Sequence, residues 1–459
     1  MLRLEFDRGT LLVHGDDTDL PDGLRLPGCV YDERVRRFRA PAYRYREVMT
    51  ALHRAGVAME NQAGGFEELA LDFRDRREPF YYQREAVDAW STSRRGVVVL
   101  PTGAGKTFVA VQILDRLRRS TLVVTPTLDL MRQWYGVLGD AFGIEIGLVG
   151  GGSYEIRDLT VSTYDSAHLH MERFGDRFAL LVFDECHHLP GPTYALAAEM
   201  SLAPFRLGLT ATPEREDGAE TRLDTLIGPI IYRREIGELA GEFLSDYDTR
   251  QIQVSLSEEE REAYLEQRAI YRGFLEEENL RLGSPSGWRR FLQAISRSER
   301  GRRAFLAYRA QKTIAQASDA KLRTLEELLA RHRQDRVLIF TSDNATVYTI
   351  SRRFLVPAIT HQTKVKERHE LLSGFAAGRY PFLVTSRVLN EGVDVPSANV
   401  GIVLSGSGTV REHVQRLGRI LRRAEGKRAL LYEVVARDTA EEFVSERRRQ
   451  HDAYRRDGG

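Results

Sequence analysis

The chain has 459 residues, which is too long for one hydrophobic core and predicts about three domains; its net charge of +1 leaves any nucleic-acid binding to local patches. Its two cysteines, Cys29 and Cys186, exclude a disulfide scaffold and are typical of a reducing compartment. No apolar run reaches the ~18 residues of a membrane span and no signal peptide opens the sequence, so we expect a cytoplasmic protein without a membrane partner.

Residues 1–75 predict a small α+β domain. The apolar runs 2–6 and 11–14 flank a glycine turn and indicate a hairpin, and residues 45–55 have amphipathic helical spacing. The stretch 34–39 is basic, with aromatic residues nearby. It predicts either a DNA contact through phosphates and stacking or a solvated strand face.

Residues 76–240 repeat a unit of apolar strand, polar strand end and helix. Such repetition indicates a doubly wound parallel sheet with its chemistry at the carboxyl ends of the strands. The strands are predicted at residues 96–99, 121–124, 159–163, 180–183 and 206–209.

A phosphate-binding turn follows the first of these strands. Its glycines let backbone N–H groups point at the β- and γ-phosphates of ATP, while Lys106 supplies a point charge and Thr107 a hydroxyl for Mg²⁺. Lys106 is the only lysine in the first 311 residues of an arginine-rich chain, which indicates that an ammonium is needed there. The alternative is a glycine turn without a ligand. The predicted cradle consists of Thr102, Gly103, Ala104, Gly105, Lys106 and Thr107.

Two carboxylates end the strand at 180–183. Asp184 is placed to hold the Mg²⁺ that bridges the phosphates, and Glu185 to orient and deprotonate the attacking water. The alternative is an acidic pair at a helix N-terminus. Upstream, Gln83 precedes a helix, and its amide offers both the acceptor and the donor that adenine recognition requires.

Residues 241–320 break the α/β alternation. Ser257 and Glu260 predict a capping box ahead of helical sequence. From 281 to 312 nine residues are basic and one is acidic, with aromatic residues between them that would stack on bases or pack the helices. The predicted phosphate contacts are Arg289, Arg290, Arg302 and Arg303, and a solvated helical face is the alternative.

A second α/β alternation occupies residues 321–440, and residues 441–459 form a polar tail. Arg419 and Arg422 share one helix face, and with Gln415 they form a Gln-x-x-Gly-Arg-x-x-Arg pattern. From a facing domain these arginines would reach the γ-phosphate as arginine fingers. The strands are predicted at residues 337–340, 382–385, 400–404 and 429–435.

Taken together, these motifs resemble those of superfamily 2 helicases over roughly residues 80–436. The short Pro-Thr-Gly-x-Gly-Lys-Thr turn, with Leu100 where the strict phosphate loop has glycine, is the form this superfamily uses. The resemblance implies that Gly392 and Asp394 belong to the nucleotide site. It also implies that the strand-end threonines hold the DNA backbone or couple it to ATP; they are Thr125, Thr163, Thr210, Thr212 and Thr385.

Within the superfamily, the triplet Arg215-Glu216-Asp217 resembles the RED motif of the xeroderma pigmentosum group B helicase family. The N-terminal unit is similar to that family's damage-recognition domain, and the insertion to its thumb. Cys186 stands where the family usually has valine, a nearly isosteric change. The triplet predicts either a wedge or latch at the cleft, or a helix N-terminus whose dipole Glu216 and Asp217 complement.

The resemblance implies the short archaeal or bacterial form. We expect two RecA-like doubly wound parallel-sheet domains, at 76–240 and 321–440, with a small N-terminal α+β domain and a helical thumb-like insertion. The expected activity is an ATP- and Mg²⁺-dependent DNA helicase or translocase that opens or remodels forked, bubble or duplex DNA in repair or transcription. It would be nucleoid-associated, and the resemblance suggests a nuclease as a partner.

Three alternatives stay open. The first is a duplex translocase or ATP-gated clamp that does not unwind processively, because its motifs are shared with helicases. The second is an RNA helicase, against which the RED motif and the thumb argue. The third is an ATP-gated scaffold with little turnover, against which an intact Glu185 argues.

Overall fold

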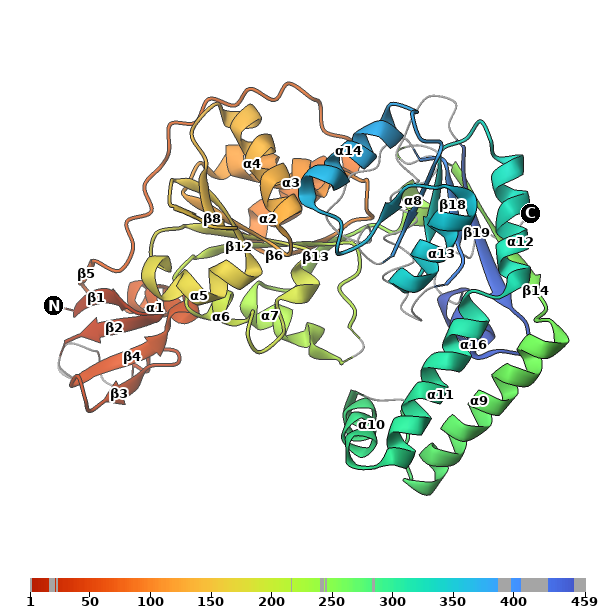
Figure 1. The fold of residues 1–459 in the computed structure, drawn as a ribbon. Helices are drawn as coiled ribbons and strands as arrows, with labels where there is room; N and C mark the ends of the chain where they lie inside the picture. Colours follow the sequence, from red (N-terminus) through yellow and green to blue (C-terminus); the bar gives the residue numbers. More distant parts are fainter. Residues whose placement is uncertain are drawn as a thin grey trace. The chain divides into compact units, whose positions relative to one another are not determined.

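The computed structural model describes residues 2–15, 21, 24–215, 217–239, 243, 246–282, 285–386, 398–405 and 428–449. The chain divides into two compact units, one of residues 1–100 and 105–234, the other of residues 101–104 and 235–459 (Figure 1). Six predicted site residues lie outside the described residues: Glu216, Gly392, Asp394, Gln415, Arg419 and Arg422.

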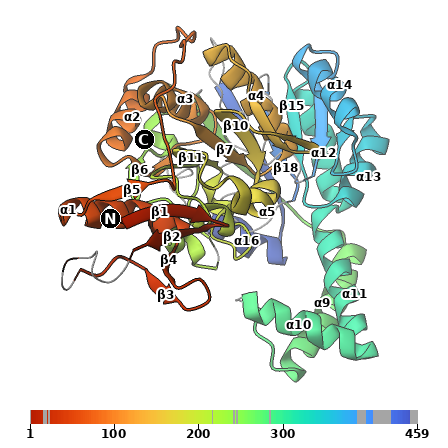
Figure 2. The ribbon, with the colours of Figure 1, turned by 90° about the vertical axis from the view of Figure 1, so that its left-hand side faces the viewer.

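The first unit begins with a 5-stranded sheet in the order β3-β4-β2-β1-β5 (Figure 2). The predicted hairpin is present, since β1 and β2 pair antiparallel with Asp7 opposite Thr10. Helix α1 (Tyr45–Arg54) buries Tyr45, Val48 and Leu52 against this sheet, as its amphipathic spacing predicts. The strands are β1 (Leu2–Asp7), β2 (Thr10–His14), β3 (Val30–Asp32), β4 (Arg37–Pro41) and β5 (Met59–Asn61).

An 8-stranded sheet follows, in the order β13-β6-β12-β11-β7-β10-β8-β9. All its neighbours are parallel except β8 and β9, whose antiparallel hairpin departs from the predicted all-parallel sheet. The strands are β6 (Arg95–Val99), β7 (Thr121–Thr125), β8 (Gly147–Gly150), β9 (Ser153–Glu155), β10 (Leu159–Thr163), β11 (Leu180–Asp184), β12 (Phe205–Thr210) and β13 (Ile230–Arg233).

Helices cover both faces of this sheet, which makes it doubly wound. Figure 1 shows α2, α3 and α4 on one side and α5, α6 and α7 on the other. The central strands β7 and β11 are buried on both faces, which explains the apolar runs at residues 122–124 and 180–183. The helices are α2 (Tyr81–Ser93), α3 (Lys106–Leu117), α4 (Leu128–Phe142), α5 (Tyr164–Phe174), α6 (Leu196–Glu199) and α7 (Arg222–Leu226).

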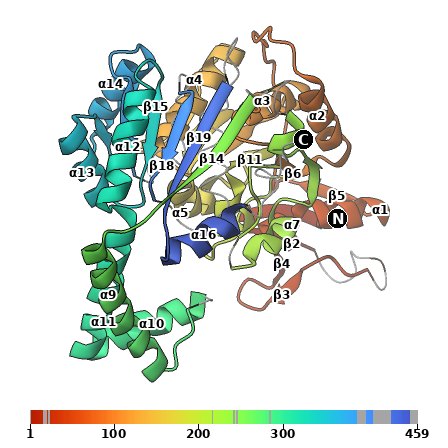
Figure 3. The same cartoon turned by 90° about the vertical axis from the view of Figure 1, so that its right-hand side faces the viewer.

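The second unit contains a 6-stranded parallel sheet in the order β14-β19-β18-β15-β17-β16 (Figure 3). Its core includes Leu325, Ile339, Val384 and Ile402. The strands are β14 (Asp246–Val254), β15 (Val337–Phe340), β16 (Ala358–Ile359), β17 (Phe382–Thr385), β18 (Val400–Val403) and β19 (Arg428–Ala436). The helices outside the insertion are α8 (Ile236–Leu239), α12 (Asp319–Arg331), α13 (Asn344–Phe354), α14 (Val365–Ala376) and α16 (Ala440–Arg449).

Strand β14 corrects one expectation. The interval 241–320 was predicted to be helical, yet residues 246–254 pair with β19 along their whole length. In the described part of the sheet β14 is an edge strand, and of its apolar residues Tyr247 and Val254 are buried. An edge strand tolerates polar residues on its exposed side, so it lacks the apolar run that marked the central strands.

The rest of the insertion is a helical arm of α9 (Glu258–Glu277), α10 (Pro285–Arg297) and α11 (Glu299–Gln316). The predicted capping box starts α9: Ser257 Oγ accepts from Glu260 N at 3.2 Å, and Glu260 Oε2 accepts from Ser257 N at 3.0 Å. Phe291 is fully buried, and its ring lies 5.3 Å from Trp288 and 6.2 Å from Phe274. These aromatic side chains therefore pack the helices of the arm against one another.

Candidate functional site

The order of the strands brings the predicted ATP-binding residues to one edge of the 8-stranded sheet. Strand β12 lies between β6 and β11, with Thr210 opposite Val99 and Leu209 opposite Asp184. Because these strands are parallel, their carboxyl ends meet at the same edge. The phosphate loop after β6, the carboxylates after β11 and Thr210 between them therefore face one region.

The phosphate loop has the backbone that its glycines predict. Gly103 and Gly105 have φ angles of +89° and +80°, in the left-handed region that favours glycine. A Cβ at Gly105 would lie 2.5 Å from Gln83 Nε2, so a larger residue does not fit. Lys106 begins α3, is buried, and donates from Nζ to the Leu100 carbonyl at 3.3 Å. The ammonium is thus held at a helix N-terminus, which suits phosphate binding.

Gln83 lies beside this loop, as predicted. It is buried at the start of α2, where its Oε1 accepts from Phe80 N at 3.0 Å and its Nε2 faces Gly105. The predicted role of Gln83 in reading adenine stays a prediction.

Asp184 accepts three hydrogen bonds. Trp134 Nε1 donates to its Oδ2 at 2.8 Å, the Glu185 N–H donates to its Oδ1 at 3.0 Å, and the Tyr164 hydroxyl donates to its backbone carbonyl at 3.1 Å. These bonds fix the direction of the carboxylate. The sequence predicted no contact of Trp134 or Tyr164 with Asp184. An indole or phenol that reaches a carboxylate on another element leaves no local signal.

Glu185 adopts a backbone conformation that is unusual for its residue type. Its φ is +47°, in the left-handed region, and this turn starts the 3₁₀ segment Cys186–His188. Its Oε2 lies 3.5 Å from Nδ1 of the buried His187, and that nitrogen lies 3.1 Å from Thr210 Oγ1. The predicted general base is therefore connected through His187 to the end of the neighbouring strand.

Cys186 points into the core instead. Its side chain is fully buried, and a Cβ on Gly208 would lie 3.0 Å from its Sγ. Burial raises the pKa of the thiol well above its usual range, so the sulfur stays a neutral apolar group. In this buried position the cysteine fills the space of the family's usual valine, so the substitution should have little effect.

The described part of the RED triplet forms an internal ion pair. Arg215 donates from Nε and Nη2 to the two carboxylate oxygens of Asp217 at 2.8 and 2.7 Å, and from Nη1 to the His187 carbonyl. Asp217 also accepts from Ala219 N at 3.2 Å, and the bonds from Arg215 hold the pKa of Asp217 well below its usual range. Arg215 therefore compensates the negative charge of Asp217. The role of the triplet stays a prediction.

The strand-end threonines are buried. Thr125 and Thr163 are opposite each other in neighbouring strands, and both hydroxyls bond within the protein. Thr163 is the N-cap of α5 and accepts from Ser166 N at 3.2 Å. Their DNA contact stays a prediction, as it does for Thr210, Thr212 and Thr385, which are also buried.

The four arginines predicted to bind phosphates lie on the exposed surface of the helical arm. Arg289 and Arg290 belong to α10, and Arg302 and Arg303 belong to α11. Among the described residues of the arm, none of the four takes part in an ion pair, whereas Arg300 pairs with Glu277 at 2.6 Å. Their charges therefore face solvent without compensation.

The fold and the phosphate loop place the chain among ATP-binding helicases. Three family profiles match it: "Xeroderma pigmentosum group B helicase damage recognition domain" over residues 4–63, "Type III restriction enzyme, res subunit" over 76–215, and "Helicase conserved C-terminal domain" over 320–424. The first profile covers the N-terminal α+β domain. The second covers the 8-stranded sheet except its strand β13, and the third covers most of the second α/β region.

Two curated relatives extend this match over most of the chain. The DNA 3'-5' translocase XPB2 of Sulfurisphaera tokodaii is 39% identical over 424 residues, which cover 92% of this chain and 96% of that protein. The DNA 3'-5' helicase XPB of Kineococcus radiotolerans is 33% identical over 383 residues, which cover 80% of this chain and 62% of that protein. The chain belongs to the xeroderma pigmentosum group B family of superfamily 2 helicases, in its short form.

A solved structure supports the fold. The Pyrococcus furiosus Hef helicase domain superposes with a TM-score of 0.53 at 19% identity, covering 81% of this chain and 98% of that one. This confirms the prediction of two RecA-like α/β domains. In the described part of the chain, no helix is both long and apolar enough to cross a membrane.

Proposed function

We propose that this protein is an ATP-driven DNA helicase or translocase that opens or remodels duplex DNA. The observation that supports this most directly is the edge of the 8-stranded sheet, where a glycine-built phosphate cradle and Asp184 lie at the carboxyl ends of β6 and β11, on either side of β12. An ATPase assay with single-stranded, duplex and forked DNA tests it. Turnover that no DNA stimulates would contradict the proposal.

The chain's own residues divide the chemistry between them. Lys106 and the N–H groups at the start of α3 bind the β- and γ-phosphates. Glu185 orients the attacking water and takes its proton. Thr107 and Asp184 would hold Mg²⁺, which neutralises charge on the phosphates. The site fits that ion because Asp184 offers a hard, ionised oxygen whose direction Trp134 and the Glu185 N–H already fix.

The second unit would complete the site. We propose that Arg419 and Arg422 stabilise charge on the γ-phosphate during transfer, with Gln415, Gly392 and Asp394 in the same nucleotide site. What supports this is the Gln-x-x-Gly-Arg-x-x-Arg spacing and the helicase C-terminal profile over residues 320–424.

Coupling to DNA would pass through His187. Its ring lies near both Glu185 Oε2 and Thr210 Oγ1, and its carbonyl accepts from Arg215. We propose that the Arg215–Asp217 pair is a latch that holds the Glu185–His187 turn. Replacing Arg215 and Asp217 together with alanine should keep DNA-stimulated turnover but lower the number of base pairs opened per ATP. If the number of base pairs opened per ATP were unchanged and the melting temperature fell, the Arg215–Asp217 pair would have only a structural role.

Duplex translocation without processive unwinding is the second candidate. One observation favours it: the relative whose length this chain covers almost completely is named a 3'-5' translocase. Strand displacement and triplex displacement, measured side by side, separate the two. If the protein displaced neither the separated strand nor the triplex, only an ATP-gated clamp would remain.

The partners proposed are DNA and a nuclease, and the proposed location is the nucleoid. Affinity capture of a nuclease activity that depends on the intact chain tests the nuclease partner. Chromatin fractionation tests the nucleoid location.

A further inference from the structure

Two arginines of the basic stretch at residues 34–39 are held in ion pairs within the N-terminal domain. Arg34 pairs with Asp32 at 3.0 Å, and Arg39 pairs with Asp7 at 2.9 Å and with Asp32 at 3.1 Å. The charges of these two arginines are therefore compensated within their own sheet. Other arginines of the first unit gather between α1 and the start of β6.

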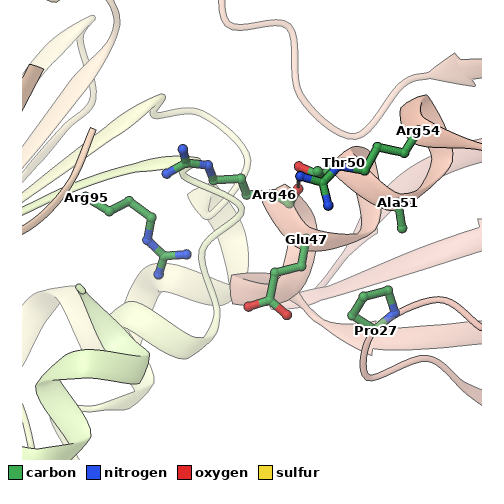
Figure 4. A pocket seen from close by; sticks show the side chains of 7 residues that line it. All are labelled: Pro27, Arg46, Glu47, Thr50, Ala51, Arg54 and Arg95. Carbon is green, nitrogen blue, oxygen red and sulfur yellow. Dashed lines mark hydrogen bonds between the residues drawn. The ribbon is translucent and has the colours of Figure 1, made fainter. Parts of the chain in front are cut away.

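A cavity of about 430 Å³ lies within the first unit, between α1 and the start of β6 (Figure 4). We call it the arginine pocket. Figure 4 shows side chains from α1 on one side and Arg95 on the other. It is lined by Pro27, Arg46, Glu47, Thr50, Ala51, Arg54 and Arg95.

The guanidinium groups of the pocket bond to neutral acceptors. Arg46 donates from Nη1 and Nη2 to the Ser93 carbonyl at 3.3 Å, and Arg95 donates from Nε to the Ile227 carbonyl at 3.0 Å. Arg54 is exposed at the mouth. The single acid in the lining, Glu47, accepts from Arg44 Nη1 at 2.6 Å. One carboxylate therefore faces several guanidinium groups.

A further buried guanidinium lies behind the pocket. Arg206 is opposite Arg95 in the neighbouring strand β12, is fully buried, and donates only to the carbonyls of Ser201, Ala203 and Leu226 among the described residues. Burial and then the Arg95 charge lower the pKa of Arg206. Burial and then the Arg46 charge lower that of Arg95. These arginines repel one another, and a bound anion would relieve that repulsion.

We propose that the arginine pocket binds a phosphate group, through Arg54, Arg46 and Arg95. A guanidinium presents five N–H donors in a planar fork that matches phosphate oxygens, and each of these arginines has donors beyond the carbonyl bonds given above. The pocket lies at the amino-terminal end of β6, whereas the ATP cradle follows that strand's carboxyl end, so this is a second phosphate site.

Phosphate of this kind comes from two sources, a phosphodiester of the DNA backbone or a free phosphate ester. The DNA source rests on the proposed function. The pocket is lined by residues of α1 and by Arg95 of β6. A DNA phosphate bound there would therefore contact both the N-terminal domain and the 8-stranded sheet.

The experiment uses the full chain and two substitutions at the mouth, Arg54→Glu and Thr50→Glu. Both positions are exposed, and neither side chain bonds outside its own helix in the described structure, so folding should be retained. Arg177→Glu is the matched control, because Arg177 is an exposed arginine of the same unit outside the pocket. Basal ATP turnover should be unchanged in all three variants.

The first readout is the melting temperature as inorganic phosphate replaces chloride at constant ionic strength. Phosphate bound at the ATP cradle contributes equally to every variant, so the comparison isolates the pocket. Phosphate should raise the melting temperature less for both mouth variants than for Arg177→Glu. Equal increases would overturn the proposal.

The second readout is the salt dependence of duplex DNA binding, which identifies the source. A backbone phosphate in the pocket predicts that each mouth variant lowers the log–log slope by about 0.7–0.9, the value of one lost contact. An unchanged slope, together with a smaller phosphate-induced rise, assigns the pocket to a free phosphate ester. A wild-type chain that binds no DNA would refute the proposed function but leave the first readout to decide the pocket.

Discussion

Trp134→Phe tests how the metal carboxylate is held. Trp134 is 1% exposed and its Nε1 donates to Asp184 Oδ2 at 2.8 Å. Phenylalanine keeps most of the apolar ring but removes the donor, so one carboxylate oxygen loses its buried partner. A hydrogen bond to a charged group contributes about 1.5–3 kcal/mol, and removing a group that orients a metal ligand typically costs about 10–100-fold in metal affinity or activity.

The expected result is a rise of about 10–100-fold in the Mg²⁺ concentration that half-saturates ATP turnover. Turnover at saturating Mg²⁺ should fall less, because Lys106 and Glu185 are unchanged. The assay titrates Mg²⁺ at fixed ATP and saturating DNA. A second readout without turnover is the Mg²⁺ dependence of the melting-temperature rise given by a non-hydrolysable ATP analogue.

Trp90→Phe is the matched control. Trp90 is equally buried, at 2% exposed, and its Nε1 donates at 3.0 Å to the Arg206 carbonyl, away from the site. It should lower stability without moving the Mg²⁺ dependence. If the two variants shift the Mg²⁺ dependence equally, or if neither does, Trp134 does not orient Asp184.

Four further predictions follow from the structure and the sequence. Lys106→Ala should abolish ATP turnover, whereas Glu185→Gln should retain ATP binding without turnover; wild-type turnover in Glu185→Gln would refute the general-base role. Arg419→Ala or Arg422→Ala should lower kcat by about 10³ or more with a much smaller change in nucleotide affinity, and an effect confined to KM would reassign them to ground-state binding. Reversing the charges of Arg289, Arg290, Arg302 and Arg303 should flatten the salt dependence of DNA binding by about 0.7–0.9 per lost contact, and an unchanged slope would mean that the arm faces a protein partner. Lys321→Met should destabilise the second unit by roughly 1–3 kcal/mol, measured by denaturant unfolding, because it removes the buried ammonium that pairs with the half-buried Glu441; Glu441→Gln in the same background should recover part of the loss.

The central strands and the phosphate loop were predictable because their signals are local. Strands β10, β15 and β17 match the predicted ranges residue for residue, and nearly all their residues are buried. The same rule missed β14, whose edge position permits polar residues. It also missed the short β8–β9 hairpin, which has too few residues for a periodic pattern.

The contacts between distant segments were not predictable. The rarity of lysine correctly indicated a special position at Lys106, and the same signal applies to Lys321, which is fully buried and donates to the Leu404 carbonyl at 2.6 Å. The basic stretch at residues 34–39 did not reveal that Arg39 pairs with Asp7 and Asp32, because these acids lie on other strands of the sheet. The charge of a residue in the sequence does not show whether the folded chain places an oppositely charged side chain next to it.

The two helices that follow the predicted DNA-binding strand ends both contact Asp184, the proposed Mg²⁺ ligand. Helix α4 begins after Thr127, which caps it, and carries Trp134; helix α5 begins after Thr163 and carries Tyr164. Trp134 donates to the side chain of Asp184 and Tyr164 to its backbone carbonyl. Because both donors are buried, a displacement of α4 by DNA would act on the direction of the carboxylate, and a displacement of α5 would act on the backbone of Asp184. DNA stimulation of ATP turnover would then need no contact between DNA and the nucleotide, and Trp134→Phe should weaken the stimulation as well as the metal affinity.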